Sequence, residues 1–502
     1  MGQLTEHAGT WSLEDRLAAV YQYLPVEVRP GTTALRVALE YERGGAVIDL
    51  GCLAPGGFRG WSGGARESFV ITADAATPGY LPGELEPGLW QVMLGLHQVP
   101  ADGVRYTVTA EVATAGPAPG WLADPPPAPP VPADRPAPRA LPARPGYRWL
   151  AGDLHAHTVH SDGAMTVPEL AAFAVRRGLD FLAVTDHNTI SHHAELAAAS
   201  RRYGIALLPG QEVTTAFGHA NVFGDAGWID FRRTADDWLD AAERAGALMS
   251  VNHPIAGPLA WLHGMRRRPP LVEVWHWSWL DLSWTIPLSW WQAWDPAAIP
   301  VGGSDWHREG SDAPLGQPTT WVEVAAFGSV ADSGAILSAV RAGRVAISAT
   351  RDGPVLLRAD EGPDAGLVAV AADGLVVAGP DGPYLRVSGD LASLPGKPGY
   401  HRLLDARGAT VALTPLLAGC GVGGGASELR WCGAIGGRVA GFVKDFVVAK
   451  DFVRHGVENP SELQKFTVNR VVFGVGGVGG GWCCGRGAES GVAVAAGGAG
   501  VG

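Results

Sequence analysis

The sequence contains few cysteines. There are five in 502 residues, and none shows the C-x-x-C spacing of a zinc site. Four of them lie in the last part of the chain, at Cys420, Cys432, Cys483 and Cys484. Because disulfide-rich proteins belong to oxidising compartments, this scarcity favours a reducing one, and we expect a cytoplasmic protein.

Long apolar runs and an excess of basic residues are also absent. No run of about 18 uncharged apolar residues occurs, so we expect no transmembrane helix. The first 24 residues lack the basic start and apolar stretch of a signal peptide. The formal net charge is −12, whereas an extended nucleic-acid surface usually needs a basic face. We therefore expect a small-molecule substrate, no extended nucleic-acid surface and no membrane partner, and the oligomeric state stays open.

Short strand-like segments dominate residues 1–115. A helix is predicted first, over residues 12–24, where Ser12 and Asp15 can form a capping box. Strand-like runs separated by Gly/Pro turns follow, at 34–41, 46–50, 68–72, 89–96 and 105–112. Short strands at regular spacing predict an N-terminal β-sandwich accessory domain.

The composition then changes three times along the chain. Residues 116–145 contain twelve prolines, so 116–146 is predicted to be a stiff linker. Over residues 147–345, apolar runs alternate with Ala-rich helical stretches, which predicts a mostly parallel α/β domain, open or closed into a barrel. Residues 346–415 are predicted to form a small β-rich extension. Residues 416–502 are Gly-rich without periodicity, which predicts a disordered tail or reflects a misread frame.

Histidines and carboxylates follow the strand-like runs of the α/β domain. The most distinctive stretch is D-L-H-A-H-T-V-H-S-D-G, and similar residues recur after five runs in total. The candidate ligands are His155, His157, Asp162, His187, Glu212, His219, His253, Asp305 and His307. Ligands gather at the carboxyl ends of strands in such folds. Mixed imidazole and carboxylate ligands suit Mn²⁺, Zn²⁺ or Fe²⁺, so we expect two or three divalent ions.

These motifs resemble those of the PHP (polymerase and histidinol phosphatase) superfamily. The similarity rests on H-A-H-T-x-x-S-D-G, T-D-H-N, the Glu of G-Q-E-V-T-T, G-H-x-N-V, N-H-P and G-S-D-x-H, in this order. More narrowly, residues 21–23, 30–32, 49–51, 57–64 and 77–80 resemble the accessory domain of the CehA/McbA family of PHP metallohydrolases. The resemblance covers about residues 10–360 and implies a distorted (β/α)7 barrel, preceded by the sandwich, with up to three metals.

The resemblance also implies how the ligands divide among the ions. One ion would take His155, His157, Glu212 and Asp305. A second would share Glu212 and take His219 and His253, and a third would take Asp162, His187 and His307.

Other polar residues nearby receive lesser roles. His160 is a supporting or surface residue, and Asp153 and Asp186 are expected to orient neighbouring histidines. His192, His193, His263 and His276 match no motif and are expected to be ordinary or pocket-lining residues.

A tryptophan-rich segment and one arginine are candidates for substrate binding. Trp277 and Trp279 lie between two predicted barrel strands and could stack on an aromatic or nucleobase group, although core packing is the alternative. Arg308, beside His307, is a candidate phosphate ligand.

The function predicted from these features is metal-dependent hydrolysis. The PHP resemblance favours a phosphoesterase that acts on small phosphorylated or nucleotide-type substrates, 5′-3′ exonuclease-like activity included, with a hydroxide held between metals as nucleophile. Asp305, Glu212 and His307 are the predicted catalytic residues, and Asp305 is a candidate for proton transfer. The CehA/McbA resemblance also admits a carbamate, ester or amide hydrolase. A binding protein with structural metals is the remaining alternative, which the scarcity of cysteine disfavours.

Overall fold

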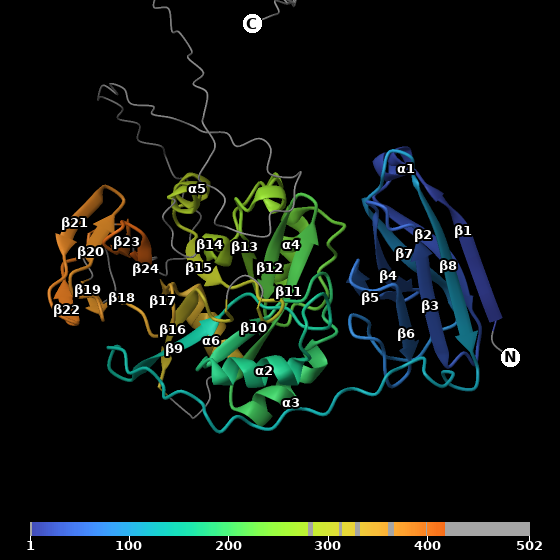
Figure 1. The fold of residues 1–502 in the computed structure, drawn as a ribbon, viewed down its shortest axis with the longest axis horizontal. Helices are drawn as coiled ribbons and strands as arrows, with labels where there is room; N and C mark the ends of the chain where they lie inside the picture. The colour runs from blue at the N-terminus through green and yellow to red at the C-terminus, as the bar shows by residue number, and fades with distance from the viewer. Residues whose placement is uncertain are drawn as a thin grey trace, which may run out of the picture. The chain divides into compact units, whose positions relative to one another are not determined.

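The computed structural model describes residues 3–279, 285–310, 314–326, 332–359, 366–397 and 399–416 (Figure 1). The described residues all lie within one compact unit, Met1–Gly423. The predicted disordered tail therefore falls, apart from Leu416, outside the described residues. Among these residues, none of the helices has the length and apolar character that crossing a bilayer requires.

The N-terminal strands form two four-stranded antiparallel sheets, drawn in blue in Figure 1. Their strand orders are β1-β8-β3-β6 and β2-β7-β4-β5. We refer to them as the N-terminal sheets. The strands are β1 (Gln3–Trp11), β2 (Tyr21–Val28), β3 (Ala34–Tyr41), β4 (Val47–Ala54), β5 (Gly57–Gly63), β6 (Ser68–Thr72), β7 (Gly88–Gln98) and β8 (Val104–Ala113).

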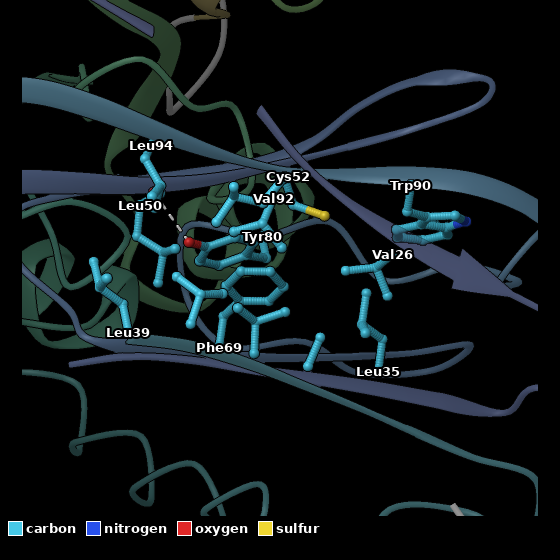
Figure 2. Close-up of a cluster of buried hydrophobic side chains, with 14 of the residues drawn as sticks. Val26, Leu35, Leu39, Leu50, Cys52, Phe69, Tyr80, Trp90, Val92 and Leu94 are labelled. Carbon is cyan, nitrogen blue, oxygen red and sulfur yellow. Dashed lines mark hydrogen bonds between the residues drawn. The ribbon is translucent and has the colours of Figure 1, made fainter. Parts of the chain in front are cut away.

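The N-terminal sheets share one hydrophobic core (Figure 2). It contains Val26 and Leu50 from one sheet and Leu35 from the other. Tyr80 packs into the same core, its ring stacked 4.0 Å from that of Phe69. Alternating apolar residues on each strand account for this core, because successive side chains point to opposite faces of a sheet.

The predicted helix over residues 12–24 is wrong in its second half. Helix α1 (Leu13–Ala18) has the expected capping box, in which Ser12 and Asp15 exchange hydrogen bonds. Strand β2 begins at Tyr21 and buries every second side chain from Leu24 onward. The period of two and Pro25, which disfavours helix at the residue before it, override the helical start.

The proline-rich segment, residues 116–146, contains no helix or strand. Two ion pairs join this segment to the α/β part of the chain. Arg135 lies 3.1 Å from Asp180, and Arg144 lies 2.7 Å from Glu323. The arginines of the segment therefore bind it to the α/β part of the chain, a contact that its proline content does not predict.

A 13-stranded sheet, the central sheet, forms the α/β part. Its order is β15-β14-β13-β12-β11-β10-β9-β16-β17-β24-β23-β20-β21. These strands are β9 (Tyr147–Asp153), β10 (Phe181–Val184), β11 (Ala206–Thr215), β12 (Gly218–Phe223), β13 (Leu248–Val251), β14 (Leu271–His276), β15 (Ile299–Gly303), β16 (Thr319–Ala325), β17 (Val345–Ser348), β20 (Val376–Gly379), β21 (Gly382–Arg386), β23 (Gly399–Leu404) and β24 (Thr410–Leu416). A separate three-stranded sheet contains β18 (Val355–Arg358), β19 (Leu367–Val370) and β22 (Leu391–Leu394).

Few helices accompany this sheet. They are α2 (Val167–Arg176), α3 (His193–Tyr203), α4 (Ala235–Arg244), α5 (Ile286–Trp294) and α6 (Ser333–Arg341), with the short 3₁₀ turns η1 (Gly257–Leu259) and η2 (Trp277–Trp279). In α2, Thr166 and Glu169 form a capping box, and Val167, Leu170 and Ala171 are buried on one face. Helices α2 and α3 pack side by side against β10 and β11 (Figure 1).

The fold is thus mixed α/β with much sheet. Strands β9, β10 and β11 are parallel, as are β13, β14 and β15. Between these two sets, β12 runs antiparallel to both neighbours, an insertion that the predicted βαβα rhythm does not include. The β-rich residues after 345 continue the central sheet, because β17 pairs with β24. The carboxyl ends of the parallel strands and the loops that follow them carry most of the candidate ligands, whereas His219 lies on the antiparallel β12.

Candidate metal centre

Glu212, on β11, lies at the centre of the candidate site. Its side chain is fully buried, a position that an ionised carboxylate occupies only with strong partners. Oε1 lies 3.2 Å from Nε2 of His155 and 3.2 Å from Nδ1 of His219, and it accepts a hydrogen bond of 2.9 Å from Asn252. Oε2 lies 2.8 Å from Nδ1 of His187. One carboxylate therefore faces imidazoles from several strand ends.

Asp305 follows β15, the first strand in the order of the central sheet, and faces two of the same imidazoles, those of His155 and His157. Oδ1 lies 2.9 Å from Nε2 of His157 and 3.1 Å from Nε2 of His155. Oδ2 lies 3.2 Å from Nε2 of His276. The two histidines of the H-x-H stretch thus lie between the carboxylates of Glu212 and Asp305.

Asp162 forms the third carboxylate of the site. Its Oδ1 lies 3.6 Å from Nε2 of His187 and 3.4 Å from Nε2 of His307. The side chain is 43% exposed, in contrast to the buried Glu212. This side of the site is therefore the one most open to solvent.

The ligand atoms fall into five overlapping groups, each compact enough for a metal ion. The groups are His155, His157, Glu212 and Asp305; His157, Asp162, His187 and His307; His187, Glu212 and His219; His155, His253 and Glu273; and His253, His276 and Asp305. The first group is the set expected for one ion, and the second contains the set expected for another.

The remaining expected set is divided in the structure. His219 groups with Glu212, whereas His253 groups with Glu273 and with His276 and Asp305. Nε2 of His253 nevertheless lies 3.4 Å from Oε1 of Glu212. All nine candidate ligands therefore lie in one continuous cluster.

Three further residues of this cluster were missed by sequence reasoning. Glu273 on β14 lies 3.0 Å from Nδ1 of His155 and accepts a hydrogen bond of 2.8 Å from the backbone of His253. Asn252 and His276 contact the two central carboxylates, as described above. A signal was present for Glu273, because a charged residue inside the apolar run Leu-Val-Glu-Val is unexpected unless it has a buried partner.

Asp153 and Asp186, which are expected to orient neighbouring histidines, each contact one histidine and also bind groups of nearby loops. Asp186 accepts hydrogen bonds from the backbone of Thr158 and the hydroxyl of Ser161, at 2.8 and 2.7 Å, and pairs with His192 outside the ligand groups. Asp153 accepts from three backbone N–H groups, that of His155 included. Both aspartates therefore hold loops, and it is Glu273 that orients the ring of His155.

Charges across the site are strongly coupled. Burial alone would raise the pKa of Glu212, but His155, His187 and His219 hold it well below its ordinary value. Burial would lower the pKa of His187, yet the carboxylates of Asp162 and Glu212 raise it to about 10. Burial and the neighbouring His307 and His187 lower the pKa of His157 to about 4. The carboxylate of Glu212 is thus ionised, as a metal ligand must be.

The backbone at two of these positions is in the left-handed region. His253 has φ of 25° and Asp305 has φ of 50°. Such angles in residues other than glycine cost on the order of 1–3 kcal/mol each and persist where surrounding contacts enforce them. The chain accepts this strain at two strand ends that direct ligand atoms into the cluster.

The predicted substrate-binding residues lie at or near the cluster. Trp277 is partly buried, with its ring 5.4 Å from that of His276. Arg308 is exposed and adjoins His307. The side chain of Trp279 lies outside the described part of the chain. Of the other tryptophans in this segment, Trp275 and Trp291 are core residues, in agreement with the packing alternative.

Histidines outside the candidate set behave as structural residues. Nδ1 of His160 lies 2.7 Å from the hydroxyl of Ser191, and Nε2 lies 3.0 Å from Glu195. His192 and His193 contact the carbonyls of Val184 and Gly210. His276 is the exception, because it contacts Asp305.

The residues present fit divalent metal ions. Buried Nε2 of His155 and Oε2 of Glu212 lack a hydrogen bond of acceptable geometry among the described residues, although both face the cluster. Imidazole nitrogens and carboxylate oxygens together form the ligand set of Mn²⁺, Zn²⁺ and Fe²⁺. Metal coordination would satisfy these atoms and balance the buried negative charge.

Comparison with known proteins places this cluster in a family context. Residues 153–254 match the PHP domain family. This PHP segment contains the ligands from His155 to His253, whereas Asp305 and His307 lie beyond it.

Curated relatives match this chain over short alignments. The 3′,5′-nucleoside bisphosphate phosphatase of Chromobacterium violaceum is 44% identical over 70 residues, which are 14% of this chain and 25% of that protein. The 5′-3′ exoribonuclease of Haemophilus influenzae is 40% identical over 63 residues, or 12% of this chain and 23% of that protein. The alignments thus span about a quarter of these relatives' length.

Solved structures show a more distant likeness. A two-domain protein from Bacteroides vulgatus, described as containing a predicted PHP-like metal-dependent phosphoesterase, is 17% identical with a TM-score of 0.37, over 56% of this chain and all of that one. An amidohydrolase from Chromobacterium violaceum is 18% identical with a TM-score of 0.27, over 38% of this chain and 96% of that one.

Proposed function

We propose that this protein is a metal-dependent hydrolase, and more narrowly a phosphoesterase of small phosphorylated or nucleotide-type substrates. The observation that carries the proposal is the position of Glu212, a buried carboxylate shared between two groups of ligand atoms. A shared carboxylate holds two metal ions close together, the arrangement that clamps a phosphoryl group in many hydrolases. The names of two curated relatives, a phosphatase and an exoribonuclease, both denote cleavage of phosphoester bonds.

The side chains of the cluster divide into holding and reacting roles. When bound, two or three divalent ions, Mn²⁺, Zn²⁺ or Fe²⁺, would polarise the phosphoryl oxygens and lower the pKa of water at the site. Glu212, His155 and His157 would hold the ions in the buried part of the site. Asp305 takes the proton of the attacking water, and His276, 3.2 Å from its Oδ2, holds the carboxylate in place.

The exposed side of the site is the proposed entrance for substrate. Asp162, His187 and His307 lie there, and Arg308 adjoins His307. A guanidinium beside the metals would bind phosphate oxygens, and the ring of Trp277 would pack against an aromatic group such as a nucleobase. We propose a small molecule as the substrate, in a cytoplasmic setting.

The finer architecture is part of the same proposal. We propose that the parallel strands of the central sheet form a distorted (β/α)7 barrel and that the N-terminal sheets form a β-sandwich accessory domain of the CehA/McbA type. The shared core of the N-terminal sheets and the ligands at the carboxyl ends of β9, β10, β13 and β15 support this interpretation.

A substrate panel with a metal control tests the proposal. The chain is loaded with Mn²⁺ and assayed on para-nitrophenyl phosphate, its bis-ester, a nucleoside 3′,5′-bisphosphate and an aryl carbamate. We expect phosphate release that stops on chelation and returns with Mn²⁺. Turnover of the carbamate alone would replace the phosphoesterase with a carbamate hydrolase on the same site.

A variant pair separates catalysis from folding. Asp305→Asn should lower kcat by about 10² or more while the protein stays folded, since proton transfer and metal binding both use this carboxylate. Asp240→Asn, on an exposed ion pair with Arg267, is the matched control and should keep full activity. If no substrate is hydrolysed in any metal-loaded sample, the proposal that the protein is a hydrolase is wrong, and a binding role takes its place.

A further inference from the structure

The loop over residues 158–163 carries Asp162, the most exposed ligand of the candidate centre. Within the described residues, Asp186 fixes one side of this loop through the backbone of Thr158 and the hydroxyl of Ser161. The backbone N–H of Gly163 closes the loop on the carbonyl of Thr158 at 3.0 Å. These contacts hold the inner side of the loop and leave the carbonyl groups on its outer side to other partners.

Those carbonyl groups are bound by an arginine from the N-terminal sheets. Arg66, in the turn between β5 and β6, donates to the carbonyl of Ser161 at 3.0 Å and to that of Val159. A guanidinium presents its donors in a rigid planar fork, so one side chain can fix two carbonyls at once. The first of these carbonyls, that of Ser161, belongs to the residue directly before Asp162.

A second contact to the same region comes from Gly79. Its N–H donates to the hydroxyl of Ser191 at 3.1 Å, and its carbonyl accepts from the hydroxyl of Thr189 at 2.9 Å. A Cβ at this position would lie 2.9 Å from the carbonyl oxygen of His160, and φ is 100°. Only glycine allows the two backbones to approach this closely.

The core of the N-terminal sheets fixes the position of Gly79. Tyr80, the next residue, inserts its ring into that core and donates from its hydroxyl to the carbonyl of Leu50 at 3.1 Å (Figure 2). The same hydroxyl lies 3.0 Å from that of Ser62. A buried and hydrogen-bonded tyrosine holds its backbone neighbour in one place, so Gly79 offers a rigid surface to the loop.

We propose that Arg66 and Gly79 are positioning residues for the metal ion held by Asp162, His187 and His307. The assignment rests on the metal centre of the proposed function and gives the N-terminal sheets a part in it. A loop that is already held in place loses less conformational freedom when it binds an ion, so it binds the ion more tightly than a free loop does. Within the described part of the chain, no contact joins Arg66 or Gly79 to the buried ligands around Glu212, so we expect the effect at one ion.

Titration of the full chain with Mn²⁺ tests this without any substrate. Calorimetry gives the affinity of each class of site, and the electron paramagnetic resonance of free Mn²⁺ counts the ions bound. In Arg66→Ala, the weakest class should lose about tenfold in affinity, the lower end of the range for residues that support metal ligands, and the tighter classes should not change. Arg66→Lys, which keeps one donor, should recover part of the loss.

Matched controls remove the effects of charge and of glycine replacement. Arg29→Ala takes away an exposed arginine of the same sheets, paired with Glu27 at 3.6 Å, and should bind Mn²⁺ as the wild type does. Gly79→Ala should weaken the same class as Arg66→Ala. Gly31→Ala also has a positive φ, of 81°, but meets nothing within 4 Å, so it should leave Mn²⁺ binding intact.

Each outcome decides for or against the positioning role. Selective weakening in Arg66→Ala and Gly79→Ala supports it, even if no hydrolytic activity is found in any sample. An unchanged titration overturns it, whether the wild type binds two ions or three. Equal weakening of every class, together with a lower melting temperature, also overturns it, because that pattern belongs to general loss of folding. Failure of the substrate panel alone would remove the enzymatic proposal and leave this one standing.

Discussion

Replacement of Glu212 by glutamine is the most direct perturbation of the centre. The change keeps the shape of the side chain and removes one negative charge that faces the imidazoles and the expected ions. In the metal-free chain Oε1 lies 3.2 Å from His155 and His219 and 3.4 Å from His253. An ion bound by these groups would lie close to the carboxylate, so the loss of its charge is felt directly.

The magnitude follows from Coulomb's law. Two unit charges 4 Å apart interact by about 4 kcal/mol at an effective dielectric constant near 20. Release of protons from the neighbouring histidines offsets part of the lost attraction. We therefore expect the free energy of Mn²⁺ binding to weaken by about 2–4 kcal/mol. That corresponds to roughly 30- to 1000-fold in affinity for the ions that share Glu212.

The assay is the Mn²⁺ titration already described, followed by thermal unfolding of the metal-free chains. Glu195→Gln is the matched control, since Glu195 also contacts a histidine, His160 at 3.0 Å, but belongs to none of the ligand groups. A folded Glu212→Gln chain that binds Mn²⁺ as tightly as the wild type would refute the reasoning.

Three further outcomes follow from the structure. Chelation should lower the melting temperature, and Mn²⁺ at about 100 times its dissociation constant should restore about 2.7 kcal/mol of stability, which scanning fluorimetry would detect and an unshifted melting curve would contradict. Because the pKa of His187 is raised to about 10, this ring holds a proton at pH 8 and must release it when Mn²⁺ binds. The affinity for Mn²⁺ should therefore rise with pH. The heat of binding should also vary with the ionisation enthalpy of the buffer. A heat independent of buffer would exclude that release. Tyr80→Phe should lower the free energy of unfolding by about 1–2 kcal/mol in urea titrations, since the carbonyl of Leu50 loses its buried donor; no loss would show that the hydroxyl is dispensable.

The strands that carry ligands were largely predictable from the sequence. Each is an apolar run that ends in a polar cluster, and such runs are buried on both faces of a parallel sheet. The strand-like runs at residues 248–251 and 299–303 predict two strands, and β13 and β15 have these same bounds. Burial explains this success. A strand that is buried on both faces is apolar along its whole length, so polar residues mark the point where it ends.

Elements with weaker patterns were missed for physical reasons. β1 is a largely exposed strand that pairs only with β8 among the described residues, so it has no continuous apolar face to mark it. β12 follows β11 after a two-residue connection, and its pairing depends on neighbours that a linear pattern does not identify. His276 and Asn252 were missed for a related reason. Their roles come from contacts with Asp305 and Glu212, which lie far away in the chain.

The balance of charge in the centre distinguishes the two candidate reactions. The ligand groups contain four carboxylates, Asp162, Glu212, Glu273 and Asp305, and otherwise histidines, which bind metals as neutral rings. Two divalent ions would neutralise these four charges, and three ions would leave a surplus of two positive charges. A surplus favours an anionic phosphoester over a neutral carbamate, because the field of a recessed site concentrates substrates of opposite charge. Under the proposed function, an ion near Asp162 would therefore decide between the two substrate classes, and a chain that loses only this ion should lose phosphatase activity while any turnover of the carbamate persists.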